Sequence, residues 1–214
     1  MKDIILAWIQ WCWKGTQAKK ILKKYWKKVA YFETWNILRA LMSNDNFIWE
    51  YLKDTVNKWL LVEDEFIIKL FSLFLETTKN KFILADGSLR KIWQTKGILK
   101  EFEKKWKKPL VIQLEIPEEE VYKRLATRKM CKNCGEIHST ALTPNIKKCS
   151  ECWWELYIRN DDADIKAIKT RIMEYNEETV PALEYIESLG LLKKIDWMQD
   201  ADKIFKQIDK LMNE

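Results

Sequence analysis

The chain has 214 residues, a net charge of +6 and an apolar content of 47%. This length fits one domain, or a core with inserted lobes, and the apolar content excludes disordered, collagen-like and coiled-coil chains. The apolar runs are too short for a membrane span, and the first run lacks the cleavage site of a signal peptide. We therefore expect a cytoplasmic protein without a membrane partner. The modest positive charge fits anionic ligands and does not point to nucleic acid.

Glycine and tryptophan occur in unusual numbers. The chain has five Gly and twelve Trp, whereas average usage predicts about 15 Gly at this length. The sum of the Gly and Trp counts comes close to the number of Gly expected. We therefore hypothesise that many tryptophans occupy positions where a working protein has glycine.

Short apolar runs alternate with helical periodicity. Residues 4–7 predict a strand buried on both faces, and residues 17–28 have helical spacing. Residues 82–85 and 110–114 predict further buried strands that lead into helices. A last strand at 192–196 precedes an amphipathic closing helix. This alternation predicts an α/β fold in three layers, with helices on both faces of a parallel sheet.

Two segments interrupt the alternation. Residues 33–62 predict short helices without a strand, and residues 127–162 contain four of the five Cys with little helical periodicity. We predict that both are lobes inserted into a core formed by 1–32, 63–126 and 163–214.

Two CxxC pairs lie in the second lobe. Cys131 and Cys134 are separated from Cys149 and Cys152 by 14 residues, and two such pairs can hold Zn²⁺ tetrahedrally. The alternatives are disulfides, which a reducing cytosol disfavours, or free thiols. Four thiolates leave no open position, so the zinc would be structural. His138, the only histidine, is expected on the surface or in a loop rather than as a ligand.

The loop after the first strand has the context of a phosphate-binding loop but lacks its glycines. Lys14, Gly15 and Thr16 open a helix after a buried strand, where backbone N–H groups, a lysine and the helix dipole can hold phosphates. Residues 8, 11 and 13 are all Trp, so the pattern GxxxxGK[ST] fails at both glycines and also at Gly15. Cys12, in the same loop, would need a neighbouring base to act as a nucleophile.

With glycine in place of tryptophan, residues 8–20 become GIQGCGKGTQAKK, which resembles the phosphate loop of the nucleoside monophosphate kinases. The resemblance covers essentially the whole chain. Residues 33–39 (ETWNILR) resemble the motif Thr-Gly-Asp-x-Leu-Arg, and residues 59–65 (WLLVEDE) resemble Gly-x-Leu-Val-x-Asp-Glu. Residues 86–90 (DGSLR), with a Gln four residues on, resemble Asp-Gly-Phe-Pro-Arg and its following Gln, although Ser88 and Leu89 depart from it.

The cysteine lobe extends the resemblance. Residues 152–156 (CWWEL) and 159–162 (RNDD) are similar to the end of the zinc-bearing lid of many bacterial adenylate kinases. Arg171 fits the helix after the lid, one residue further from the Asp pair than expected. The chain therefore resembles the adenylate kinase family, which implies the P-loop nucleoside monophosphate kinase fold, a monomer and the reaction ATP + AMP ⇌ 2 ADP. It also implies structural Zn²⁺ in the lid and Mg²⁺ with ATP.

The resemblance also implies roles for individual residues. The residues expected to bind ATP are Trp11, Cys12, Trp13, Lys14, Gly15, Thr16 and Arg124. Those expected to bind AMP are Thr34, Arg39, Leu60, Val62, Gly87, Arg90, Gln94, Arg159 and Arg171, of which Thr34 and Gln94 would contact adenine. The residues expected to be catalytic are Lys14, Arg90, Arg124, Arg128, Arg159 and Arg171. Asp86 would order Mg²⁺ through water, or else cap a helix.

Eleven tryptophans fall where this family commonly or plausibly has glycine, at residues 8, 11, 13, 26, 35, 49, 59, 106, 153, 154 and 197, and Trp93 falls where it usually has proline. Some bacteria read the codon UGA as glycine, and translating such a gene with UGA as tryptophan would produce this pattern. We call the chain with all its tryptophans the literal chain. In it, three indoles in the phosphate loop should abolish ATP binding, because a non-glycine residue is strained where φ is positive and the ring fills the space that the phosphate needs.

Three other interpretations remain open at this stage. The acceptor could be UMP or CMP. The chain could be an inactive relative with genuine tryptophans that still binds zinc. It could also be a zinc-ribbon module that binds nucleic acid through a continuous basic stripe, although the Lys-Gly-Thr context and the paired arginine motifs argue against that.

Overall fold

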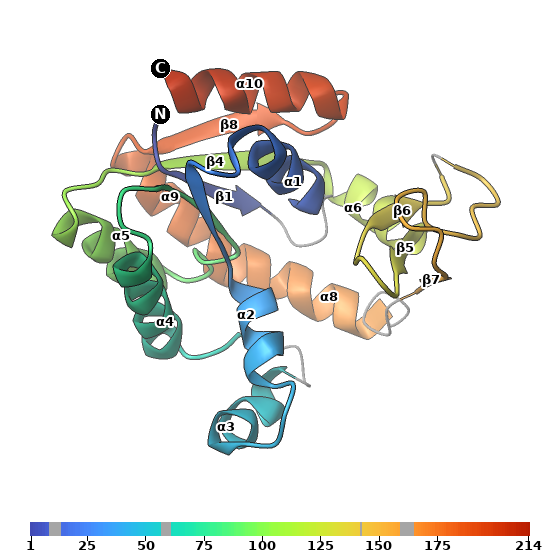
Figure 1. Ribbon diagram of the computed structural model, residues 1–214, viewed down its shortest axis with the longest axis horizontal. Helices are drawn as coiled ribbons and strands as arrows, with labels where there is room; N and C mark the ends of the chain where they lie inside the picture. The colour runs from blue at the N-terminus through green and yellow to red at the C-terminus, as the bar shows by residue number, and fades with distance from the viewer. Residues whose placement is uncertain (9–13, 57–60, 142, 159–164) are drawn as a thin grey trace.

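A five-stranded parallel sheet forms the centre of the molecule (Figure 1). The computed structural model describes residues 1–8, 14–56, 61–141, 143–158 and 165–214. The sheet has the order β2-β3-β1-β4-β8, and its strands are β1 (Ile4–Trp8), β2 (Val29–Glu33), β3 (Phe82–Asp86), β4 (Leu110–Glu115) and β8 (Leu192–Asp196).

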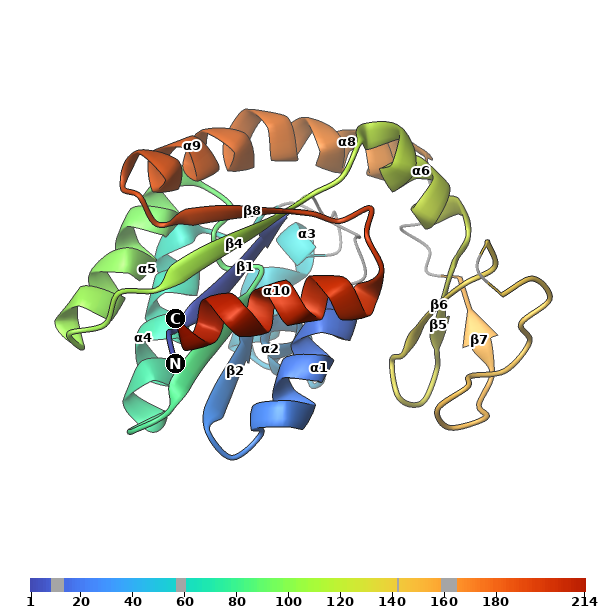
Figure 2. The same cartoon turned by 90° about the horizontal axis from the view of Figure 1, so that it is seen from above.

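Helices cover both faces of this sheet (Figure 2). Successive residues of β1 point to opposite faces, so Ile4 and Leu6 pack in one apolar cluster and Ile5 and Ala7 in the other. The first cluster includes residues of α1 (Lys14–Tyr25), α6 (Glu118–Ala126), α8 (Ile165–Glu174) and α10 (Ala201–Asn213). The second includes residues of α4 (Asp64–Thr77), α5 (Ile92–Lys104) and α9 (Val180–Ser188). The predicted three-layer α/β fold is therefore confirmed.

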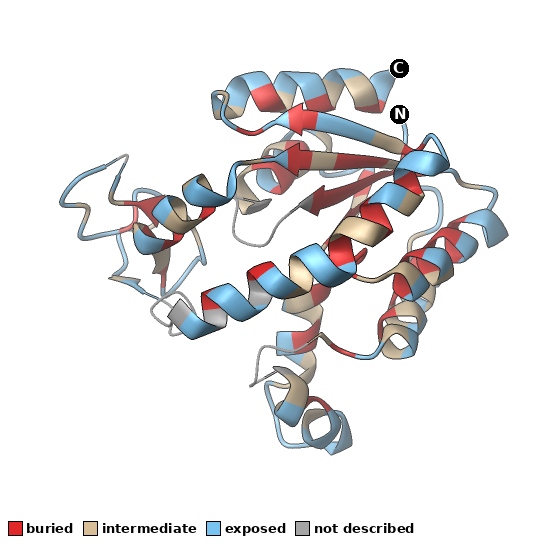
Figure 3. Ribbon diagram, turned by 180° about the vertical axis from the view of Figure 1, so that it is seen from behind, coloured by how far each residue is buried: buried red, intermediate tan, exposed pale blue. Residues whose placement is uncertain are grey.

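Two groups of elements lie outside these layers. α2 (Thr34–Leu41) and α3 (Phe47–Val56) project from the sheet at one end. After α6, the strands β5 (Arg128–Cys131), β6 (Ile137–Ser139) and β7 (Leu156–Tyr157) form a small antiparallel sheet in the order β6-β5-β7. Figure 3 shows buried residues concentrated in the central sheet and the helices against it, with few on α3.

The second strand is where prediction and structure differ most. The helix predicted for residues 17–28 runs from Lys14 to Tyr25, and β2 follows at Val29–Glu33, where no strand was predicted. β2 is an edge strand in which only Val29 and Phe32 are buried, so it lacks the continuous apolar run that marks the central strands. A π-helical turn at Tyr175–Thr179, between α8 and α9, was not predicted either. In the described parts of the chain, no helix has the length and apolarity that crossing a membrane requires.

Helices α5 and α9 end in the same turn, but with different residues at its key position. After α9, the N–H of Gly190 donates to Glu187 at 2.9 Å, and the next N–H donates to the carbonyl of Ile186. After α5, the N–H of Trp106 donates to Glu103 at 2.9 Å, and the next N–H donates to Phe102. Both central residues are left-handed, with φ of 67° at Gly190 and 56° at Trp106. This pair of bonds is the Schellman motif, whose left-handed position is usually glycine.

Trp106→Gly should raise the free energy of unfolding by about 1 kcal/mol, because the left-handed backbone is strained for any residue with a Cβ and this indole is 98% exposed. Denaturant unfolding of both proteins measures the difference. The matched control is Trp93→Gly in the first turn of α5, where glycine should cost about 0.5 kcal/mol because its unfolded chain is more flexible. Equal or lower stability of Trp106→Gly would contradict the assignment of a glycine turn.

Candidate functional site

The carboxyl ends of three parallel strands bring a carboxylate pair together. In the sheet register Asp86 of β3 lies beside Leu6 of β1 and Glu33 of β2. The hydroxyl of Thr34 donates to the carbonyl of Asp86 at 3.2 Å, and Asp86 is 1% exposed. Ligand sites in open parallel sheets form at this edge, where the loops after the strands converge.

Tyr31 links the two carboxylates. Its hydroxyl lies 3.2 Å from Oε2 of Glu33 and 3.4 Å from Oδ2 of Asp86. Burial, assisted by the two carboxylates, raises the pKa of Tyr31, so the hydroxyl keeps its proton and acts as a donor. Neither Tyr31 nor Glu33 was among the predicted site residues. The missing signal was β2 itself, because pairing with β3 places Glu33 beside Asp86 and Tyr31 two residues earlier, beside Leu84.

A cavity of about 20 Å³ lies next to this edge. Five of the nine residues predicted to bind AMP line it: Thr34, Val62, Gly87, Arg90 and Gln94. Trp35, Leu38, Leu61 and Ile67 complete the apolar side of its wall. Residues from 34 to 94 in the chain are thus gathered around one cavity, as the motifs predict for a single ligand.

Hydrogen bonds fix the polar side of this small cavity. The N–H of Arg90 donates to Oε1 of Gln94 at 2.9 Å, and the hydroxyl of Thr179 donates to the carbonyl of Arg90 at 3.0 Å. Arg90 is 6% exposed, and Gln94 and Thr179 are buried as well. Because the oxygen of Gln94 is engaged, its amide nitrogen is left to donate to a ligand. Sequence patterns gave Thr179 no such role, since it lies 89 positions from Arg90.

A larger cavity of about 450 Å³ lies between the core and the cysteine lobe. Thr16 and Arg124, both predicted to bind ATP, line it together with Gln17, Glu120, Lys123, Thr127, Ser139, Ala141 and residues 197–201 and 204. Nε of Arg124 donates to Glu120 at 2.8 Å, and its guanidinium lies 3.8 Å from the sulfur of Met198. The turn at 197–201 was not predicted as part of a site, although it follows the carboxyl end of a strand.

The other predicted residues are placed less directly. Five of them lie outside the described residues: Trp11, Cys12, Trp13, Leu60 and Arg159. For two more only the backbone position is described, which is the start of α1 for Lys14 and α8 for Arg171. Gly15 has open space around the position of a Cβ. Arg39 is on the exposed side of α2, where it donates to Asn36. Arg128 is buried at the start of β5, and neither cavity includes it or Arg39 among its lining residues.

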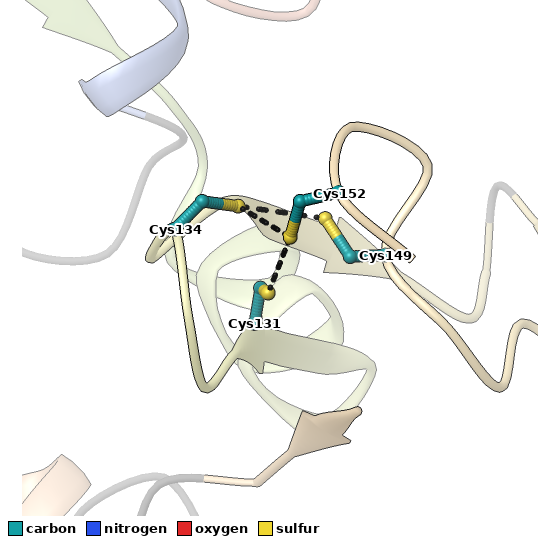
Figure 4. Close-up of side chains that lie close together, drawn as sticks. All are labelled: Cys131, Cys134, Cys149 and Cys152. Atoms are coloured by element: carbon teal, nitrogen blue, oxygen red, sulfur yellow. Dashed lines mark hydrogen bonds between the residues drawn. The ribbon is translucent and has the colours of Figure 1, made fainter. Parts of the chain in front are cut away.

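The four cysteines of the second lobe converge on one point (Figure 4). Their sulfurs lie within 4.8 Å of one another, with Cys131 to Cys152 at 3.4 Å and Cys134 to Cys149 at 3.5 Å. None forms a disulfide. Tetrahedral zinc with Zn–S bonds of about 2.3 Å needs sulfurs about 3.8 Å apart, so the cluster fits the ion closely.

The sulfurs are surrounded by donors. Backbone N–H groups lie 3.4 Å from the sulfurs of Cys131 and Cys149. A backbone hydrogen bond from Trp154 lowers the pKa of Cys152 to about 6, whereas burial raises the pKa of Cys134, so the thiolate that a metal requires forms more readily at Cys152 than at Cys134. His138 was expected on the surface or in a loop, but it lies in β6 and is buried, 8% exposed, with Nε2 at 3.3 Å from the sulfur of Cys149. That expectation was wrong because β6 pairs with β5 and is packed against the cysteine cluster.

The two CxxC turns are structural copies of each other. In the first, the N–H of Gly135 donates to Cys131 at 3.2 Å and the φ of Gly135 is 67°. In the second, the N–H of Trp153 donates to Cys149 at 2.9 Å and the φ of Trp153 is 63°. Glycine and tryptophan therefore occupy the same left-handed position. The indole of Trp153 is 76% exposed, so no packing offsets the strain.

Comparison with known proteins identifies relatives over most of the chain. A family model described as adenylate kinase matches residues 11–191. The adenylate kinase of Archaeoglobus fulgidus is 31% identical over 94% of this chain and 93% of its own. The one from Lachnoclostridium phytofermentans is 32% identical over 91% and 90%, and the one from Bacillus cytotoxicus is 32% identical over 98% of both chains.

Purified protein should carry one zinc ion per chain, and Cys149→Ser should remove it, because three thiolates and a hydroxyl bind zinc much more weakly than four thiolates. Native mass spectrometry measures the occupancy, and the loss of zinc should lower the Tm of the lobe. Ser150→Ala, in the same turn but without a sulfur, is the matched control and should retain the ion. A metal-free unaltered chain would refute the zinc site.

Proposed function

The chain belongs to the adenylate kinase family, and we propose that it transfers a phosphoryl group reversibly from ATP to AMP, giving two ADP, through the two cavities described above. The observation that carries the proposal is the small cavity, where Thr34, Val62, Gly87, Arg90 and Gln94 meet beside Asp86. The larger cavity reaches Thr16 at the start of α1 and Arg124 on α6. Both cavities are lined by residues that follow the carboxyl ends of strands, so a donor and an acceptor would meet at that edge of the sheet.

The residues that line the small cavity are proposed to bind AMP, whose bulk would lie outside the cavity itself. Gln94 accepts from the backbone of Arg90, so its amide nitrogen is oriented to donate to a ring nitrogen of adenine. Arg90 is held through its own backbone by Gln94 and Thr179, and its guanidinium is proposed to bind the phosphate with two parallel hydrogen bonds.

The larger cavity is proposed to hold the ATP base and ribose. The phosphates would then follow α1 toward its N-terminus, where Lys14, Gly15 and Thr16 open the helix and its dipole favours anions. Mg²⁺ bound with ATP would supply charge neutralisation, and the buried Asp86 is proposed to order it through water. Because phosphoryl transfer needs positioning and positive charge rather than a strong base, the arginines at 90, 124, 128, 159 and 171 suit the reaction.

Two lobes are proposed to close over the substrates. Residues 33–62, which include α2 and α3, would cover AMP, and residues 127–162 would form a zinc-stapled lid over ATP. The lid already contacts the core, since Lys19 of α1 pairs with Glu136 beside the first CxxC turn. Closure would exclude water, so that hydrolysis does not compete with transfer.

We also propose that the functional polypeptide has glycine at most of the tryptophan positions. Two internal comparisons support this: Trp106 repeats the turn of Gly190, and Trp153 repeats the turn of Gly135. Each pair has the same hydrogen bonds and the same left-handed φ, and both indoles are exposed. Trp197 differs, because it is 4% exposed and packs in the core. Reading of UGA as glycine by the host accounts for the pattern, and the codons or the intact mass of the host's own protein test it.

The triple variant Trp8→Gly, Trp11→Gly and Trp13→Gly should turn over ATP and AMP at least roughly 100-fold faster than the literal chain, because three indoles no longer fill the space that the phosphates need. Coupled detection of ADP measures the rate. Trp26→Gly, at an exposed position in neither cavity lining, is the matched control and should leave the rate of the literal chain unchanged. Brisk turnover by the literal chain would refute the proposed decoding, and no turnover by the triple variant would refute the kinase assignment.

Gln94→Glu, introduced into the triple variant with glycine at residues 8, 11 and 13, should raise the KM for AMP by about 10-fold or more. The reason is that a carboxylate presents an acceptor where adenine needs a donor. The KM for ATP should change little, since Gln94 does not line the larger cavity. Lys96→Gln, on the exposed side of the same helix, is the control. An unchanged KM for AMP, or a preference for UMP or CMP in competition with AMP, would contradict the adenine contact.

A further inference from the structure

The only histidine of the chain lies against the proposed metal centre, where it is not needed as a ligand. The four sulfurs of Cys131, Cys134, Cys149 and Cys152 suffice for tetrahedral zinc. His138 is on β6, and its Nε2 lies 3.3 Å from the sulfur of Cys149, within the range of an N–H···S hydrogen bond. Both residues are buried, at 8% and 1% exposure, so water does not compete for the contact.

The strand pairing fixes the direction of this side chain. β6 runs antiparallel to β5, with His138 opposite Lys129 and Ser139 opposite Arg128. Neighbouring residues of a strand point to opposite faces. Ser139 lines the larger cavity and bonds to Thr127 at 3.0 Å, whereas His138 faces the cysteine cluster. The pairing of β5 with β6 therefore positions the imidazole beside the sulfur of Cys149, and this position does not require a bound metal.

A zinc ion with four thiolates carries two negative charges in a partly buried site, so donors around the sulfurs stabilise it. Cys131 and Cys149 each accept one backbone N–H in equivalent turns, at 3.4 Å in both. Cys149 has in addition the contact with His138. The geometry points to a specific role: we propose that His138 donates its Nε2–H to the thiolate of Cys149 and is a positioning residue that strengthens zinc binding. This inference rests on the zinc site proposed above.

Three variants separate hydrogen bonding from packing. His138→Phe keeps a ring but removes the donor, and we expect it to weaken zinc binding by about 10- to 100-fold, the usual effect of removing a partner of a metal ligand. His138→Gln keeps a donor at a similar reach and should restore most of the affinity. Ser139→Ala is the matched control, because Ser139 is equally buried on the same strand but bonds to Thr127. Competition with a chromogenic zinc chelator gives each dissociation constant.

The outcomes distinguish this inference from the zinc site itself. If the unaltered chain binds no zinc, both fail. If it binds zinc and His138→Phe binds equally tightly, or if His138→Gln is as weak as His138→Phe, the hydrogen bond is refuted and the zinc site stands.

One measurement needs no substitution, and it keeps the proposal testable should His138→Phe not fold. Because His138 is the single histidine, its two nitrogens are identified directly in a long-range ¹H–¹⁵N spectrum of the zinc-loaded protein. We expect Nε2 to carry a proton. An Nε2 without a proton, whether bound to the metal or free, would overturn the proposal.

Discussion

Parallel pairing of β1 with β3 and β4 is the constraint on which the rest of the site depends. The register aligns Leu6 with Asp86, and Asp86 with Glu33 on the next strand, so the loops that follow three strands begin at the same edge. Because β1 is buried on both faces, a slip of one residue would exchange the side chains that pack in the two apolar clusters and disrupt the packing of both. Burial in the sheet thus sets the relative positions of groups that are distant in the chain.

The sequence predicts the central strands, the helices against them and the cysteine cluster, because each is marked by a local pattern of apolar runs, helical spacing or CxxC pairs. It does not predict β2, whose burial is partial and whose partner β3 lies about 50 residues further on. Tyr31 and Glu33 were missed for the same reason. Thr179 acts on Arg90 through a contact that only the folded chain creates. The burial of His138 likewise depends on the pairing of β5 with β6, which no short motif encodes.

The tryptophans illustrate how backbone conformation can reveal more than residue type. A turn with a positive φ is favourable for glycine and costly for other residues. The protein contains two kinds of such turn, and each kind occurs once with glycine and once with tryptophan at the left-handed position. The comparison is internal, so it requires no reference protein. Trp197 is an exception to this pattern, because it packs as an ordinary core residue.

The ion pair between Lys19 and Glu136 joins α1 to the cysteine lobe on the solvent side, with the lysine half exposed. Exposed pairs of this kind contribute little, about 0–1 kcal/mol, and salt screens them further. Such a tether can bias the lobe toward the core without holding it there. Both products must leave the enzyme before the next turnover, and a weak ion pair lets the lobe open quickly for their release. A higher ionic strength would weaken this contact before it affected the central sheet.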